Sequence, residues 1–82
     1  MSEAVFADTL KQVGSGRTLS AEESAAAFAS IMRGEVSQPR IAAFLTALAV
    51  RRPQVPEIVG AVRAMRASMR KVRSLRSQRE VS

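Results

Sequence analysis

The sequence contains no cysteine, no histidine, no tryptophan and no tyrosine, and these absences exclude several kinds of site. Without cysteine there are no disulfides and no thiolate metal ligands. Without histidine the chain lacks the commonest general base and the commonest side-chain ligand of metal ions. Any chemistry would therefore have to come from carboxylate, Lys, Arg or Ser side chains.

Long apolar runs are also missing. No stretch approaches the ~20 consecutive apolar residues of a membrane-spanning helix, and no basic N-terminal segment precedes an apolar one, as in a secretory signal. We therefore expect a cytoplasmic protein without a membrane span. The 82 residues allow one small domain of modest stability, because so short a chain buries only about 60–65% of its surface on folding.

The net charge of +6 is concentrated at the C-terminal end of the chain. Residues 1–62 carry six basic and six acidic side chains, so this part is neutral overall. Residues 63–82 carry seven basic side chains against one acidic residue, Glu80. A basic composition restricted to one segment does not by itself indicate a nucleic-acid-binding protein.

The spacing of apolar residues predicts four helices and no strands, near residues 3–13, 20–33, 38–51 and 55–75. The fold class is therefore all-α, a small bundle of four helices. We place the bundle domain at residues 1–72, and assign residues 73–82 to a basic tail that is separate from the last helix or continues it.

Three local signals support these helices. Ser20 and Glu23 fit a capping box, in which each side chain accepts a hydrogen bond from the backbone of the other residue. Gly34 suits the position after the second helix, because glycine takes a positive φ without penalty. The third helix is apolar nearly all round, which predicts burial on more than one side.

The fourth helix carries apolar residues at alternating spacings of three and four, a heptad-like seam that needs a partner helix. This seam consists of Val55, Ile58, Val62, Met65, Met69 and Val72. We expect its first half to pack inside the domain and its second half to bind another chain. Gly60 costs about 1 kcal/mol relative to alanine in a helix, which indicates the close approach of a neighbouring backbone.

Several segments, taken together, carry a resemblance to a known family. They read LSAEE at 19–23, IMRGEVS at 31–37, IAAFLTAL at 41–48, EIVGA at 57–61 and AMR at 64–66. In this order and spacing they resemble the N-terminal helical domain of anthranilate phosphoribosyltransferase over roughly residues 5 to 70, and more loosely that of pyrimidine nucleoside phosphorylases. Beyond about Lys71 the resemblance stops, where the family continues into a strand and a Gly-Thr-Gly-Gly-Asp phosphate loop.

The resemblance implies an enzyme that transfers a phosphoribosyl group from phosphoribosyl pyrophosphate to anthranilate, with magnesium, in tryptophan biosynthesis. It places the phosphate loop, the metal motif and most anthranilate contacts in a large α/β domain, and the homodimer contact in the helical domain. Later helices complete this bundle in the family, so we expect an incomplete version here. The chain would be a partial or truncated enzyme, inactive alone, without catalytic, cofactor or metal sites of its own.

Two surfaces are candidates for binding. Apolar residues left without partners predict a homo-oligomer, preferably a dimer, that self-associates through Phe44, Leu48, Val62, Met65, Met69 and Val72. Beside the seam, a stripe of arginines favours anions, such as nucleic-acid phosphates, and consists of Arg63, Arg66, Arg70 and Arg73. The alternative function is therefore a free-standing basic adaptor for nucleic acid, although no aromatic residue lies near the stripe for base stacking.

Overall fold

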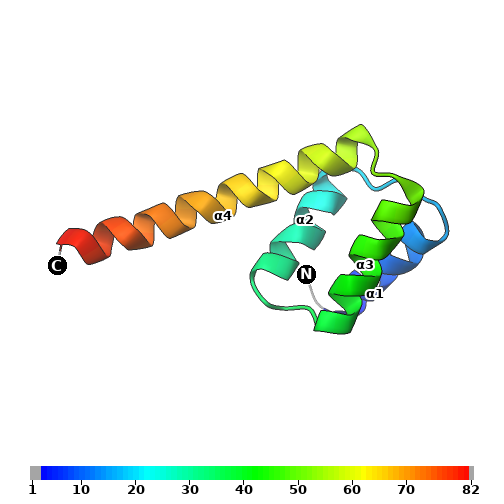
Figure 1. Ribbon diagram of the computed structural model, residues 1–82, viewed down its shortest axis with the longest axis horizontal. Helices are drawn as coiled ribbons and strands as arrows, with labels where there is room; N and C mark the ends of the chain where they lie inside the picture. Colours follow the sequence, from blue (N-terminus) through cyan, green and yellow to red (C-terminus); the bar gives the residue numbers. More distant parts are fainter. Residues whose placement is uncertain (1–2, 82) are drawn as a thin grey trace.

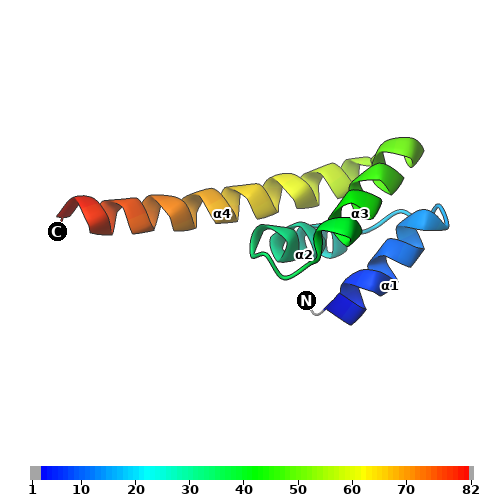
Figure 2. The same cartoon turned by 60° about the horizontal axis from the view of Figure 1, so that its bottom comes forward.

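The computed structural model describes the backbone of residues 3–81 and the side chains of residues 3–70. The four helices are α1 (Glu3–Gly14), α2 (Ala21–Met32), α3 (Gln38–Arg51) and α4 (Val55–Val81). Residues 3–81 contain no strand, so the predicted all-α class is confirmed. Helices α1, α2 and α3 group together, while α4 extends well beyond them (Figures 1 and 2). Instead of ending near residue 75, α4 continues through residues 73–81.

The helix boundaries follow from local hydrogen bonds. The hydroxyl of Ser20 accepts from the Glu23 N–H at 3.1 Å, and the Glu23 carboxylate accepts from the Ser20 N–H at 2.9 Å, which confirms the capping box. Gly34 follows α2 with a φ of 72°, as expected. Ser37 occupies the N-cap of α3 without a side-chain bond, and its N–H instead donates to the Glu3 carboxylate at 3.0 Å, which ties α3 to α1.

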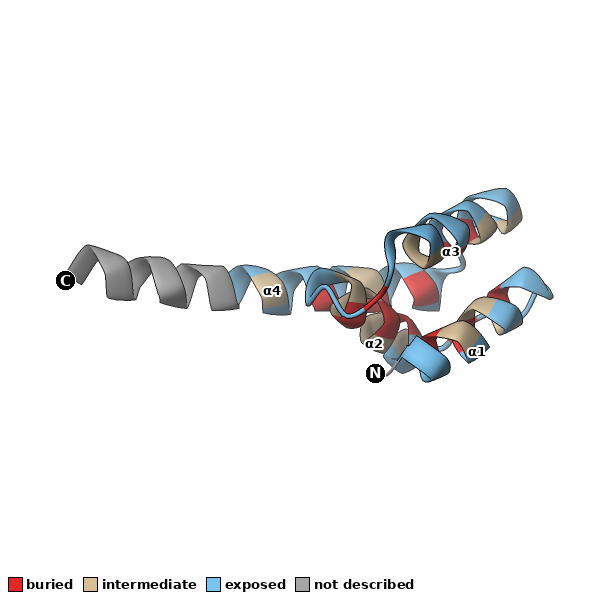
Figure 3. Ribbon diagram, turned by 90° about the horizontal axis from the view of Figure 1, so that it is seen from below, coloured by how far each residue is buried: buried red, intermediate tan, exposed pale blue. Residues whose placement is uncertain are grey.

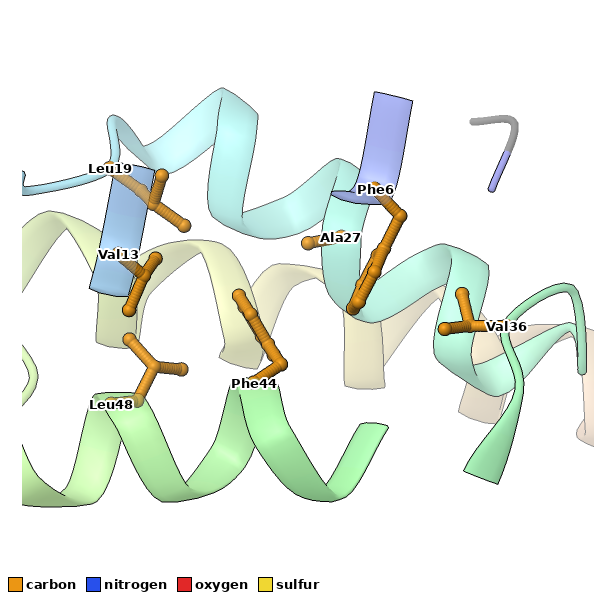
Figure 4. Close-up of a cluster of buried hydrophobic side chains, with 7 residues drawn as sticks. All are labelled: Phe6, Val13, Leu19, Ala27, Val36, Phe44 and Leu48. Carbon is orange, nitrogen blue, oxygen red and sulfur yellow. The ribbon is translucent and has the colours of Figure 1, made fainter. Parts of the chain in front are cut away.

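The hydrophobic core lies between α1, α2 and α3 (Figure 4). The rings of Phe6 and Phe44 are fully buried, with centroids 5.1 Å apart. Phe28 approaches Phe44 edge-on at 5.6 Å, the geometry that the charge distribution of aromatic rings favours. The other buried members are Val13, Leu19, Ala27, Val36 and Leu48. None of the described side chains of α4 belongs to this cluster, so α4 is attached to the domain in another way.

Helix α4 packs against α2 through small residues. Gly60 is buried there, and a Cβ at this position would lie 2.7 Å from both the Ala25 nitrogen and the Ser24 Cβ, and closer still to the Ala21 carbonyl oxygen. One turn further along, Ala64 is also buried. The close backbone approach predicted at Gly60 is therefore confirmed.

The expectation that the first half of the apolar seam packs inside the domain is wrong. Val55 and Ile58 are exposed, as is Val62. Helical geometry explains the difference, because residues at the spacing of Gly60 and Ala64 lie on the side of α4 opposite the seam. The small residues allow the helix backbones to approach each other, and this contact leaves the larger apolar side chains facing outward.

A buried carboxylate fixes the start of α4. Glu57 is 2% exposed, and its two oxygens accept from the Leu19 N–H at 2.9 Å and the Gln54 N–H at 2.8 Å. Arg51, at the end of α3, contributes an ion pair at 2.5 Å. The Glu57 carbonyl oxygen also accepts from the Ser24 hydroxyl at 2.7 Å. One residue thus holds the loop before α2, the end of α3 and the start of α4 together.

The pKa of Glu57 reflects two opposing effects, burial and hydrogen bonding. Burial raises the pKa, because it disfavours the charged carboxylate. The hydrogen bond from Arg51, followed by those from the backbone of Gln54 and Leu19, outweighs burial and holds the pKa below its ordinary value. The carboxylate is therefore charged at neutral pH, and its hydrogen bonds satisfy it in that form.

The Gly60 contact yields a first prediction. Gly60→Ala gains about 1 kcal/mol of helix propensity, but overpacking costs about 1–3 kcal/mol, and the surrounding backbone atoms of α2 cannot move aside as a flexible side chain could. We expect a net loss of up to about 2 kcal/mol in the free energy of unfolding, measured by urea denaturation. Gly14→Ala is the control, because no heavy atom lies within 4 Å of a Cβ there. Equal stability of the two variants would contradict the packing described here.

The Glu57 cluster yields a second prediction. Glu57→Gln removes the charge that pairs with Arg51 and replaces an acceptor oxygen with a donor. Breaking a buried ion pair on one side costs about 3 kcal/mol or more, so we expect a large loss of stability in thermal or urea denaturation. Glu22→Gln, at an exposed acidic residue of α2, is the matched control and should be close to neutral.

The same carboxylate predicts a dependence of stability on pH. Because folding lowers the pKa of Glu57 from about 4.5, its stabilising contribution is fully present above pH 4.5 and is lost as the pH falls below that value. Urea denaturation between pH 3 and 6 should show the wild type losing stability more steeply than Glu57→Gln, at about one proton per molecule. Parallel curves for the two proteins would show that Glu57 does not carry this effect.

Candidate functional site

The structure separates the residues predicted to form a self-association surface into two groups. Phe44 and Leu48 are 0% and 5% exposed and pack in the core, so their assignment to an exposed surface is corrected. They lie one turn apart on the side of α3 that faces α1 and α2. Val62, Met65 and Met69 are exposed together on α4. The side chain of Val72 lies outside the described residues.

An apolar stripe runs along the side of α4 that points away from α2, and we call it the α4 outer face. Its residues are between 38% and 72% exposed and consist of Val55, Ile58, Val62, Met65 and Met69. Large apolar side chains exposed in a continuous row on a small domain usually mark a binding surface. The stripe therefore remains a candidate site even though two of the predicted residues are buried elsewhere.

Arginines border the α4 outer face. Arg63, Arg66 and Arg70 are exposed and line a shallow hollow together with Ile58, Val59 and Val62. None of the ion pairs formed among residues 3–70 includes these three arginines. The only acidic residue of α4 within that range is Glu57, which is buried and already paired. This side of α4 is therefore positively charged, while the fourth predicted member, Arg73, has a side chain outside the described residues.

A second hollow lies between the end of α2 and α4 and has a different electrostatic character. Its lining residues are Ala29, Met32, Arg33, Glu35, Ala64, Ala67 and Ser68. Arg33 donates two hydrogen bonds to the Glu35 carboxylate, at 3.0 and 3.2 Å. The hydrogen bond between them raises the pKa of Arg33 and lowers the pKa of Glu35. These two charges balance each other, so the hollow offers no unpaired charge from this pair.

A second exposed surface lies on α3, where burial on more than one side had been predicted. That prediction is wrong, because the outward side of α3 is exposed along its length (Figure 3). This α3 outer face is defined by Ala42, Ala43, Leu45, Thr46, Ala49 and Val50. Residues 41–50 contain no charged side chain. The arginines at either end, Arg40 and Arg51, are paired with Glu3 and Glu57.

Two features escaped the reasoning from sequence. The structural role of Glu57 was not predicted, although its place three residues after Gln54 is the acidic position of a capping box. Gln54 is not a typical capping residue, so the signal was incomplete. The exposure of Leu45 and Val50 was missed because the apolar spacing of α3 is compatible with burial on either side.

The chemistry available to the described side chains is limited. Within the part of the chain that the structure describes, no three acidic residues lie close enough together to hold a metal ion. In the same part, none of the helices combines the length and the apolar character needed to cross a membrane. The features that the described residues do form are two exposed apolar faces, one uncharged and one bordered by arginines.

Comparison with known proteins identifies the family to which the sequence is similar. Residues 7–69 match the model of the glycosyl transferase family, helical bundle domain. The anthranilate phosphoribosyltransferase of Haemophilus influenzae strain PittGG is 49% identical over 52 residues, which cover 63% of this chain and 16% of the relative. The enzyme of the same name from Methylorubrum populi is 51% identical over 56 residues, covering 68% of this chain and 17% of the relative.

A third relative, the anthranilate phosphoribosyltransferase of Desulfatibacillum aliphaticivorans, is 40% identical over 57 residues, covering 70% of this chain and 17% of the relative. The matched part thus spans about one sixth of the length of these relatives. No solved structure gives a significant match. Since the family model covers most of the chain, and since the relatives bear out the resemblance to the N-terminal domain of anthranilate phosphoribosyltransferase, the chain belongs to the helical bundle domain of the glycosyl transferase family.

Proposed function

We propose that the chain supplies the helical bundle of an anthranilate phosphoribosyltransferase and acts there in assembly, not in chemistry. The relatives carry that name, and the match to the family model, residues 7–69, includes Gly60. On this proposal the enzyme works in the cytoplasm, and its phosphate loop, its magnesium site and most of its anthranilate contacts lie outside this bundle. The observation that carries the assembly role is the exposed, uncharged outer face of α3.

The α3 outer face suits a second copy of the chain. Ala42, Leu45 and Ala49 recur at i, i+3 and i+7, so they form one row along the helix. Alanine side chains allow close contact between helix backbones, as at Gly60. A twofold axis brings the same surface of each copy together, and an uncharged surface can meet its own copy without repulsion. Burial of apolar area would then favour association.

The α4 outer face suits a second copy less well than the sequence indicated. Two of the predicted residues, Phe44 and Leu48, lie in the core and cannot contribute to it. Of the four on α4, the three with described side chains, Val62, Met65 and Met69, stand on the same helix as Arg63, Arg66 and Arg70. In an antiparallel twofold pair, both rows of arginines would lie along the same edge of the interface, where like charges repel. We therefore place the proposed dimer contact on α3.

Two double variants, each of which introduces two glutamates, test the dimer prediction. Leu45→Glu with Ala49→Glu should convert a dimer into a monomer, because the two copies would bring four carboxylates into one apolar interface. Met65→Glu with Met69→Glu, at exposed positions of α4, should leave the dimer intact. Sedimentation equilibrium at micromolar concentration measures both, with circular dichroism to verify folding. If only the α4 double variant dissociates, the dimer contact lies on α4 at Val62, Met65 and Met69, contrary to the proposal. A monomeric wild type would contradict dimerisation itself.

A further prediction concerns catalysis. The 82-residue chain should show no phosphoribosyl transfer, because stabilising a pyrophosphate leaving group requires clustered metal ligands, and the described residues provide no such cluster. Loss of anthranilate fluorescence in the presence of phosphoribosyl pyrophosphate and magnesium is the measurement. The protein must come from a host without its own enzyme, and turnover by that preparation would contradict the proposal.

A chimaera tests the family role directly. The segment of the Haemophilus influenzae enzyme that aligns with this chain over 52 residues can be replaced by the corresponding segment of this chain. If the bundle functions in assembly of that enzyme, the chimaera should fold, dimerise and retain transfer activity. A folded, dimeric chimaera without activity would show that the bundle also contributes to the reaction, contrary to the proposal.

A further inference from the structure

The turn between α3 and α4 contains a residue in an unfavourable backbone conformation. Arg52 has a φ of 71° and a ψ of 120°. A positive φ is unfavourable for a residue with a Cβ, and the ring of Pro53 restricts the preceding residue further, towards negative φ. The other positive φ values among the described residues belong to Gly16 and Gly34. Arg52 is therefore strained, and strain of this kind persists only where the surrounding structure enforces it.

The carboxylate of Glu57 holds this turn from both sides. It forms an ion pair with Arg51, directly before the strained residue, and accepts from the Gln54 N–H at 2.8 Å, two residues after it. The Gln54 side chain donates to the carbonyl oxygen of Arg52 at 3.4 Å. The same carboxylate accepts from the Leu19 N–H at 2.9 Å, which anchors it to the loop before α2. We call the contacts of Glu57 with Arg51, Gln54 and Leu19 the Glu57 clamp.

We propose that this turn is a conformational device, in which the Glu57 clamp holds Arg52 in its strained conformation and release of the clamp lets the turn open while the core stays folded. Strain in the closed turn favours its opening. Residues 52–56 are all exposed, so opening uncovers little apolar surface. The core cluster between α1, α2 and α3 includes no described side chain of α4, so it does not require a closed turn.

The state of the turn decides how firmly α4 is held. With the clamp closed, the helix is fixed both at its start and at the contact of Gly60 and Ala64 with α2. With the clamp open, only the contact with α2 remains, and α4 can tilt about it. The junction lies within one domain, so the device operates whether or not the chain dimerises.

Amide hydrogen exchange of the full chain, followed by NMR, measures the opening. The amides of Gln54 and Glu57 report on the turn, because one donates to the Glu57 carboxylate and the other to the Gln54 carbonyl oxygen. Amides in the middle of α2, around Ala27, report on the core. In the wild type the turn amides should open at least about tenfold more often than those of α2. Equal protection of the two groups would overturn the proposal.

Two variants of Arg52 test the strain. Arg52→Gly removes it, because glycine takes a positive φ without penalty, whereas Arg52→Ala loses the same charged side chain but keeps the Cβ. Opening at Gln54 should be about fivefold less frequent in the glycine variant than in the alanine variant. Equal opening in the two variants would show that the turn stores no strain and would overturn the proposal.

A weakened clamp tests whether Glu57 enforces that strain. In the background of Arg51→Gln the turn can relax, so the fivefold difference between glycine and alanine at position 52 should fall towards equality. If circular dichroism shows that Arg51→Gln does not fold, Arg51→Lys, which keeps the charge, provides the same comparison. An undiminished difference in the folded background would mean that Arg52 is strained independently of the clamp, contrary to the proposal.

Discussion

Three separate parts of the chain meet at the carboxylate of Glu57. It accepts a hydrogen bond from the Leu19 N–H before α2 and another from the Gln54 N–H before α4, and it forms an ion pair with Arg51 at the end of α3. An unpaired carboxylate in such a place would be costly, so these partners must be present together. The hydrophobic core orders α1, α2 and α3, whereas this polar cluster determines where α4 begins and in which direction it leaves.

The placement of α4 then decides which residues become surface. With its start held by Glu57 and its inner side occupied by Gly60 and Ala64, α4 can present only its opposite side to the solvent. The apolar stripe and the arginines thus become one exposed face. Similarly, packing of Phe44 and Leu48 into the core turns the small uncharged residues of α3 outward. Both candidate binding surfaces follow from interactions inside the domain.

Reasoning from sequence succeeded where a local interaction determines the structure. The capping box of Ser20 and Glu23, the positive φ of Gly34 and the close approach at Gly60 could all be predicted, because each depends on residues within one element or on the absence of a Cβ. It failed where the sequence pattern allowed either of two helix faces to be the buried one. For α3 and α4, apolar periodicity indicated a helix but not which side would be buried.

The four-point contact of Glu57 could not be predicted for a related reason. Its partners are separated by up to 38 residues in the sequence, and only the folded topology brings them together. The same holds for the pairing of Arg40 with Glu3, which lie 37 residues apart in the sequence. Long-range polar contacts of this kind leave no periodic signal, whereas the family resemblance, which depends on short segments in order, was recognisable.

The small-residue contact between α2 and α4 has a mechanical consequence. Since α4 extends far beyond the other helices (Figure 1), a small change of angle at the Gly60 contact, taken as a pivot, becomes a large displacement at its far end. The helix runs about 30 Å from that pivot to Val81, so a tilt of about 5° at the pivot would displace the far end by nearly 3 Å. A single methyl group at Gly60 would therefore shift the far end of α4, even with the start of the helix held by Glu57.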